Sequence, residues 1–383
     1  MLRRLDRLIL KELVGPWLFG VAMFTVLIMA ASYLFKASDF LVQGVSGLTV
    51  LQFILLNLPG IMVKTFAMAV LLASLLAFGR LSSDSEIVAI RASGVSVYRI
   101  MQPVALFSLV IAIVAFLVDE TIVPRAAFET LQMEANIAKN LKGNLNRITG
   151  YPVEEKGELR AFVTAKDLSV ENRSMTGAVV SIFPTGKNVR DKDKNQPDAY
   201  LSADTLVFDP KKFQSGGGWR IQGQATLTSR DGRNILNIED GAWPPQVPSL
   251  TASPIDILTD QVKNLDVFNM SQIRAEIDKE KHRVRPRREK IANYEYGYWN
   301  KIALPLAALI YGLLGAPLGI RNHRTGTAAG FALSVAIIFG YITLGNLLNI
   351  YAMGGKIPAF VASFTPLVIG LVASGVIMWR RNA

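Results

Sequence analysis

Six long apolar runs, three on each side of a long polar stretch, constrain this chain more than any other feature. Each run is close to the roughly 20 residues that an α-helix needs to cross about 30 Å of hydrocarbon. Backbone groups in lipid must find partners within the spanning structure, and a helix supplies them inside a single segment. Barrel strands would be shorter and would alternate. The runs therefore predict six transmembrane helices, at residues 14–34, 51–78, 100–118, 302–320, 327–351 and 357–379.

The polar stretch between the two groups of runs has a different hydrophobic period. Its first part, to residue 141, still has a helical pattern, and the rest consists of short, often alternating apolar runs. Clusters of Gly, Asn, Asp and Pro separate these runs, which is typical of an all-β sandwich or jelly roll. The predicted strands lie at residues 160–165, 178–183, 199–208, 219–221, 224–229 and 234–238.

Together these patterns predict an integral membrane α+β protein with three parts. Residues 1–118 form an N-terminal transmembrane half with three helices, and residues 298–383 form a C-terminal half with three more. Residues 119–297 form a large, jelly-roll-like β-domain with helical connectors, inserted between the third and fourth transmembrane helices.

Basic residues mark one side of the membrane. They gather before the first run, between the second and third, between the fourth and fifth, and after the last. By the positive-inside rule these positions are cytoplasmic, so we expect both termini inside and the β-domain outside. The residues are Arg3, Arg4, Arg7, Lys11, Arg80, Arg91, Arg99, Arg321, Arg324, Arg380 and Arg381.

The net charge of +11 comes almost entirely from this asymmetry. Residues 119–297 hold 26 Lys and Arg against 25 Asp and Glu, whereas the two transmembrane halves hold the other 15 basic and 5 acidic residues. Because membrane topology accounts for the charge, we expect no nucleic-acid partner.

One cytoplasmic segment, residues 79–94, predicts a short helix at about residues 83–93 between two spans. Ser83 and Glu86 have the spacing of a capping box, in which each side chain satisfies an unpaired backbone N–H. Gly94 suits a C-terminal stop. Capping alone would explain Glu86, and a second interpretation of this carboxylate comes from a resemblance to a known family.

The same segment resembles the coupling segment of the LptF/LptG permeases, the membrane subunits of the ABC transporter that extracts lipopolysaccharide from the inner membrane of Gram-negative bacteria. The layout of three spans, a large insert and three spans also matches. Further matching residues are Leu5 to Glu12, Lys301 to Leu306 at the start of the fourth span, Arg321 to Gly326, and Pro358.

The resemblance implies partners and a location in the bacterial inner membrane, with a periplasmic β-domain. A dimer of LptB-like ATPases would dock on the coupling helix, and a second LptF/LptG-type permease, a paralogue or another copy, would complete the cavity. The jelly roll would pass lipopolysaccharide acyl chains to LptC/LptA-like bridge proteins. The coupling residues would be Asp84, Ser85, Glu86, Ile87 and Arg91.

Four cations within or beside the spans have two interpretations. Lys64 lies near the middle of the second run, where a charge costs at least about 2.5 kcal/mol unless it faces a cavity or a partner. Lys36, Arg125 and Lys301 lie nearer the outer interface, where long side chains commonly reach toward water. The functional interpretation is that all four contact phosphates of the substrate.

Two further patterns also leave alternatives open. The cluster Arg283, Arg285, Arg287 and Arg288 suits a solvated face near lipid head groups or a site for an anionic substrate. Gly315 with Gly319, and Gly326 with Gly330, have the G-x-x-x-G spacing. That spacing is typical of close helix packing, within the chain or at the seam to a partner permease.

The sequence contains no recognisable catalytic or metal-binding constellation. Without a Walker A loop, the chain needs a partner to hydrolyse ATP, so we expect no bound cofactor and no metal. It has no Cys and only two His. Three alternatives to lipopolysaccharide export are a permease for another lipid or a lipoprotein, a membrane sensor with a ligand-binding β-domain, and an intramembrane enzyme.

Overall fold

The computed structural model describes most of the chain. The described residues are 2–142, 148–155, 158–169, 172–184, 196–209, 218–241, 243–254, 257, 265–282, 286, 288–320 and 327–382. They divide into two compact units, which we call the helical unit and the β unit. The helical unit contains residues 1–131, 265–281 and 286–383, and the β unit contains residues 132–264 and 282–285.

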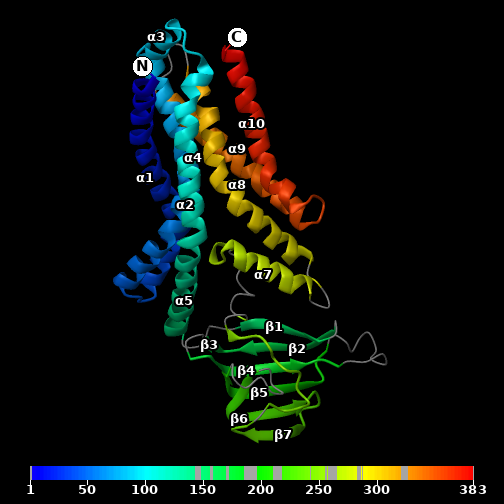
Figure 1. Cartoon of the computed structure of the whole chain (residues 1–383). Helices are drawn as coiled ribbons and strands as arrows, with labels where there is room; N and C mark the ends of the chain where they lie inside the picture. Colours follow the sequence, from blue (N-terminus) through cyan, green and yellow to red (C-terminus); the bar gives the residue numbers. More distant parts are fainter. Residues whose placement is uncertain are drawn as a thin grey trace. The chain divides into compact units, whose positions relative to one another are not determined.

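The helices occur on both sides of the strands in the chain (Figure 1). In order they are α1 (Leu2–Val42), α2 (Gly47–Ser83), α3 (Glu86–Ala92), α4 (Val97–Thr121), α5 (Val123–Lys142), the 3₁₀ turn η1 (Leu265–Val267), α7 (Met270–Lys281), α8 (Arg288–Gly319), α9 (Thr327–Met353) and α10 (Ala359–Asn382).

Within the described residues, six helices are long and apolar enough to cross a membrane: α1, α2, α4, α8, α9 and α10. This confirms the six predicted helices. Each observed helix extends beyond its apolar run at one end or at both, because the residues there continue the helical hydrogen bonding. At about 1.5 Å per residue, the 41 residues of α1 are roughly twice as long as a bilayer core is thick.

Helices α2 and α8 form the centre of the helical unit. In the most apolar 18-residue stretch of each helix, the buried share of residues is 78% in α2 and 67% in α8. The corresponding share is only 17% in α1 and 11% in α9. Glycine allows this close approach. A Cβ at Gly315 would lie 2.9 Å from the Ser74 Cβ, and one at Gly319 would lie 2.8 Å from the Phe78 Cβ. The first G-x-x-x-G pair therefore packs α8 against α2.

The predicted helical extension after the third span is present with one interruption. Helix α4 ends at Thr121 and α5 begins at Val123. Pro124 explains the break, because proline has no backbone N–H to continue the hydrogen bonding of the preceding helix.

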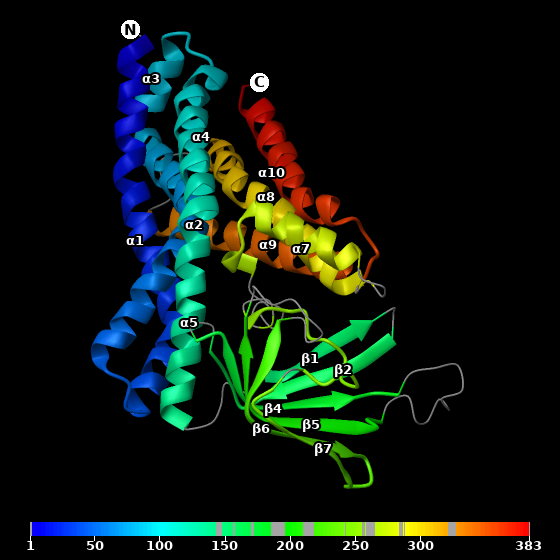
Figure 2. The ribbon, with the colours of Figure 1, turned by 60° about the horizontal axis from the view of Figure 1, so that its bottom comes forward.

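The β unit contains one antiparallel sheet in the order β1-β2-β4-β5-β6-β7, with β3 paired to β4. Figures 1 and 2 show β1 and β7 at opposite edges. The antiparallel pairing agrees with the expected all-β domain, whereas the jelly-roll form stays a prediction. The strands are β1 (Ile148–Glu155), β2 (Glu158–Ala165), β3 (Asp167–Ser169), β4 (Ser174–Ile182), β5 (Ala199–Phe208), β6 (Trp219–Ser229) and β7 (Asn234–Glu239).

Two predicted strands are one continuous strand. The runs at 219–221 and 224–229 both belong to β6, and the register with β5 shifts between Ala203 and Thr205. Gly223 lies at this irregularity with φ +82°. Glycine adopts such a conformation at low cost, so β6 bulges here instead of ending. Strands β1 and β3 were not predicted, because the first contains Gly and Pro and the second has only three residues.

The core of the β unit lies on one face of the sheet. Trp219 is its largest fully buried side chain, and its ring lies 5.3 Å from that of Phe208. Its indole N–H donates to the Ala252 carbonyl at 2.9 Å. Ala252 belongs to an irregular segment after β7 whose apolar residues join the same core: Trp243, Val247, Leu250, Ala252 and Ile257.

Candidate coupling and substrate sites

The short helix predicted at about residues 83–93 is present as α3, which has seven residues, Glu86–Ala92, and lies between α2 and α4 in the chain. Ile87 is 1% exposed and packs in a cluster with Ile9, Leu13 and Phe78. The other predicted coupling residues are exposed: Asp84, Ser85, Glu86 and Arg91. Two apolar side chains, the buried Ile87 and the partly buried Ile90, therefore anchor α3 to the bundle, while its charged residues face outward.

The predicted capping box is wrong. Leu81 and Ser82 are buried in the bundle, so α2 continues through Ser83, whose hydroxyl donates to the Arg80 carbonyl at 2.8 Å. Helix α3 begins three residues later, at Glu86, and its N-cap Ser85 makes no side-chain capping hydrogen bond. Capping by Ser83 therefore does not account for Glu86.

The predicted end of the coupling helix is confirmed. Gly94 has φ +85°, a left-handed conformation that glycine adopts without strain. Its N–H donates to the Arg91 carbonyl at 2.9 Å. The chain can therefore turn directly from α3 into α4.

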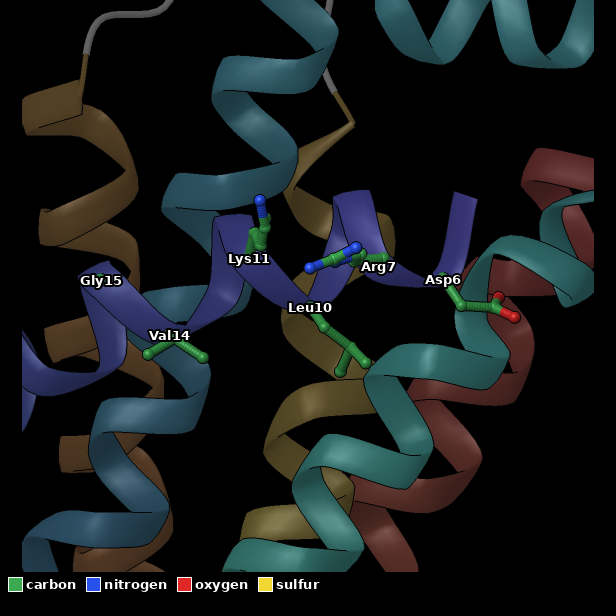
Figure 3. A pocket seen from close by; sticks show the side chains of 6 residues that line it. All are labelled: Asp6, Arg7, Leu10, Lys11, Val14 and Gly15. Carbon is green, nitrogen blue, oxygen red and sulfur yellow. The ribbon is translucent and has the colours of Figure 1, made fainter. Parts of the chain in front are cut away.

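Two ion pairs tie the ends of α1, α2 and α4 together near α3. Asp6 of α1 lies 2.7 Å from Arg99 of α4, and Glu12 of α1 lies 3.2 Å from Arg80 of α2. Asp6 also borders a shallow hollow along α1, whose other lining residues are Arg7, Leu10, Lys11, Val14 and Gly15 (Figure 3). Asp6 and Glu12 of α1 therefore each form an ion pair with a neighbouring helix.

The four predicted substrate cations differ in environment. Lys301 of α8 is 7% exposed and donates to the Asp119 carboxylate of α4 at 3.1 Å. Lys64 of α2 donates to the Asp266 carboxylate of η1 at 2.8 Å, with side chains that are 44% and 30% exposed. The Lys301 charge is thus enclosed and neutralised, whereas Lys64 keeps a path to the surroundings.

The other two cations are exposed. The Lys36 ammonium lies 5.6 Å from the centre of the Phe53 ring, within cation–π range. Tyr33 and Phe40 pack on the same ring, at 5.8 Å and 5.3 Å. Arg125, on α5, has no ion-pair partner among the described residues. An arriving anion therefore meets Arg125 without first displacing a carboxylate that the described residues pair with it.

The two carboxylates that pair with Lys64 and Lys301 were not predicted from the sequence. A lysine inside a span needs a partner, and Asp119, at the end of the third predicted run, could have been proposed on that ground. Asp266 lies 202 residues from Lys64 along the chain, within a polar stretch, so nothing local marks it. Lys64 and Asp266 are brought together only by the fold.

Some predicted features lie outside the described residues. These are Arg283, Arg285 and Arg287 of the arginine cluster, and the whole segment from Arg321 to Gly326. In the part of the chain that is described, no group of three or more His, Cys, Asp or Glu residues could hold a metal ion.

Comparison with known protein families gives one result that covers nearly the whole chain. The family model described as lipopolysaccharide export system permease LptF/LptG matches residues 7–380. No curated protein matches the chain significantly. The family match agrees with the six membrane-capable helices and the antiparallel sheet between them in the chain. The chain therefore belongs to the LptF/LptG family of lipopolysaccharide export permeases, and it is a multi-pass inner-membrane transporter subunit and not itself an enzyme.

Proposed function

We propose that this chain extracts lipopolysaccharide from the inner membrane by using ATP hydrolysis in a separate LptB-like ATPase dimer. In this arrangement both termini are cytoplasmic and the β unit is periplasmic. A second LptF/LptG-type permease faces the helical unit, and the β unit passes acyl chains toward LptC/LptA-like bridge proteins.

The observation that carries the proposal is the construction of α3. Its buried residue, Ile87, packs with residues of α1, α2 and α4, so a push on α3 reaches three of the membrane-capable helices. Glu86 and Arg91 are exposed on α3, and the Asp84 carboxylate is exposed at the C-cap of α2, just before it. A short helix that is anchored on one side and charged on the other suits docking into a groove of a partner protein.

On the opposite side of the membrane, we propose that Lys36, Lys64 and Arg125 receive phosphates of the lipopolysaccharide. Lysine and arginine bind phosphate through short, charge-assisted hydrogen bonds. Lys301 contributes differently, because it is buried against Asp119, and we assign it to holding α8 on α4.

The coupling role predicts that Glu86→Lys abolishes recovery of the ATPase. Charge reversal at an exposed docking residue places like charges together, which suppresses association strongly. Pull-down of the tagged chain from solubilised membranes, followed by mass spectrometry, measures this. The matched control is Glu129→Lys, the same reversal at an exposed position of α5. Equal ATPase recovery with the wild-type chain and Glu86→Lys would contradict the proposed docking.

The substrate role predicts that Lys36→Gln combined with Arg125→Gln weakens lipopolysaccharide capture. A hydrogen bond to a charged group contributes about 1.5–3 kcal/mol, so loss of these contacts should lower capture by about tenfold or more. A photocrosslinking residue at Phe35, which is 79% exposed on α1, reports bound lipopolysaccharide. The control is Lys356→Gln, on the exposed turn before α10. Undiminished crosslinking in the double variant would remove the proposed contacts.

A further inference from the structure

The segment Leu265–Lys281, which contains η1 and α7, is held on the helical unit by several contacts. We call it the connector. It follows residue 264, the last residue of the long part of the β unit, so it is where the chain re-enters the helical unit. Helix α7 packs against α8, and Lys281 of α7 lies 2.7 Å from Glu295 of α8.

The beginning of the connector is fixed most tightly. Leu265 lies very close to Gly297 of α8, and a Cβ at position 297 would collide with the Leu265 side chain. Phe268 packs edge-on against Tyr294 of α8, with ring centres 6.2 Å apart. The Glu120 carboxylate of α4 accepts the first N–H of α7, from Met270, at 3.0 Å. These contacts dock the connector on α4 and α8.

One further contact ties the connector to α2, and it is the ion pair of Lys64 with Asp266. The neighbouring pair, Lys301 with Asp119, has the same chemistry but side chains only 7% and 10% exposed. Lys64 and Asp266 are 44% and 30% exposed. A buried pair is costly to separate, whereas a half-exposed pair leaves room for a second anion to reach the lysine.

A phosphate competes well for such a lysine. It carries up to about two negative charges and three acceptor oxygens, against one charge on a carboxylate. A second carboxylate, that of Asp119, lies close enough to interact electrostatically with both Lys64 and Asp266. The negative charge of Asp119 attracts Lys64 and repels Asp266, so it weakens the hold of Lys64 on Asp266.

We propose that Asp266 is a replaceable counter-ion, which a phosphate of the substrate displaces from Lys64 and thereby loosens the connector from α2. The inference rests on the substrate role proposed for Lys64 and adds a consequence to it. Binding of the substrate phosphate to Lys64 would thus change how firmly the connector is held on α2. The connector is the segment through which the chain re-enters the helical unit. Asp266 is a positioning residue in this scheme, and an anionic head group is the ligand that releases it.

A cysteine reporter on α7 can measure the release. The chain has no native cysteine, so a single thiol is specific. Ile273 lies on α7 and is fully buried, and α7 packs on α8. In nanodiscs, Ile273→Cys should react slowly with a water-soluble maleimide until the connector loosens. Ile277→Cys, 8% exposed on the same helix, is the second reporter if the first variant folds poorly.

Three backgrounds and two lipids separate the outcomes. Lipopolysaccharide should raise the reaction rate of the reporter by about tenfold, as expected for a shift of a docked segment toward an open state. Chemically dephosphorylated lipopolysaccharide should leave the rate unchanged. Asp266→Asn should react fast without any lipid. The charge exchange Lys64→Asp with Asp266→Lys restores the pair, so it should react slowly with and without lipopolysaccharide.

Crosslinking at Phe35 in the same samples tells the two proposals apart. Bound lipopolysaccharide with an unchanged reporter rate would overturn the release of the connector and leave the export function standing. Equal acceleration by the dephosphorylated lipid would overturn the exchange at Lys64. Absence of lipopolysaccharide binding in every sample would remove the proposed substrate role, and the inference with it.

Discussion

Replacing Lys301 with methionine is expected to destabilise the helical unit by about 3–5 kcal/mol, because it leaves a buried carboxylate without its partner. Lys301 and Asp119 are 7% and 10% exposed, and the lysine ammonium also donates to the Asp119 backbone carbonyl at 3.0 Å. Both contacts join α8 to α4. Thermal unfolding in nanodiscs, followed by intrinsic tryptophan fluorescence, should show a clearly lower midpoint.

Two variants test the cause of this destabilisation. Adding Asp119→Leu to Lys301→Met removes both charges, and because apolar replacement of a whole buried pair is often neutral, most of the lost stability should return. Lys356→Met removes an exposed lysine and should leave the midpoint unchanged. A Lys301→Met chain as stable as the wild type would show that the pair does not hold α8 and α4 together.

Trp219→Ala is expected to destabilise the β unit by about 3–5 kcal/mol, the usual cost of removing a fully buried large aromatic side chain. The variant also leaves the Ala252 carbonyl without the indole donor that it has in the native core. Limited proteolysis should then cut between residues 132 and 264 at a lower temperature. Trp379→Ala, at a tryptophan that is 68% exposed on α10, is the matched control.

The functional readouts of this variant should separate. Capture of the ATPase depends on α3 in the helical unit, so pull-down should recover the ATPase from Trp219→Ala chains as from wild type. Delivery of lipopolysaccharide to the bridge proteins should fall, since we assign that step to the β unit. Unchanged delivery by a chain whose β unit is cut would refute that assignment.

The helices were predictable because their signal is local. A run of about 20 apolar residues forms a membrane helix whatever it packs against, and α2 and α8 agree with their runs. Helix ends depend more on tertiary contacts. The burial of Leu81 carried α2 past the expected start of α3, and no spacing of Ser and Glu records that packing.

In the β unit, alternation predicted the strands whose residues face a core on one side. It failed where that rule is weak, at β1 with its Gly and Pro and at the bulge in β6. Among the candidate site residues, the set at α3 came from the resemblance to the LptF/LptG permeases, whereas neither the resemblance nor the local sequence gave the environments of Lys64 and Lys301. Ion-pair partners are fixed by the fold, so a sequence names the lysine and leaves its carboxylate unidentified.

The glycine contact between α8 and α2 also constrains how the chain is made. Ser74 and Gly315 touch across the bundle, yet 241 residues separate them in the sequence. At about 5–20 residues per second, α2 is in the membrane for roughly 12–48 s before α8 is synthesised. During that interval the groove on α2 has lipid or an insertase against it. Packing of α8 on α2 therefore waits until α8 has been synthesised, and α2 must then exchange a temporary neighbour for α8.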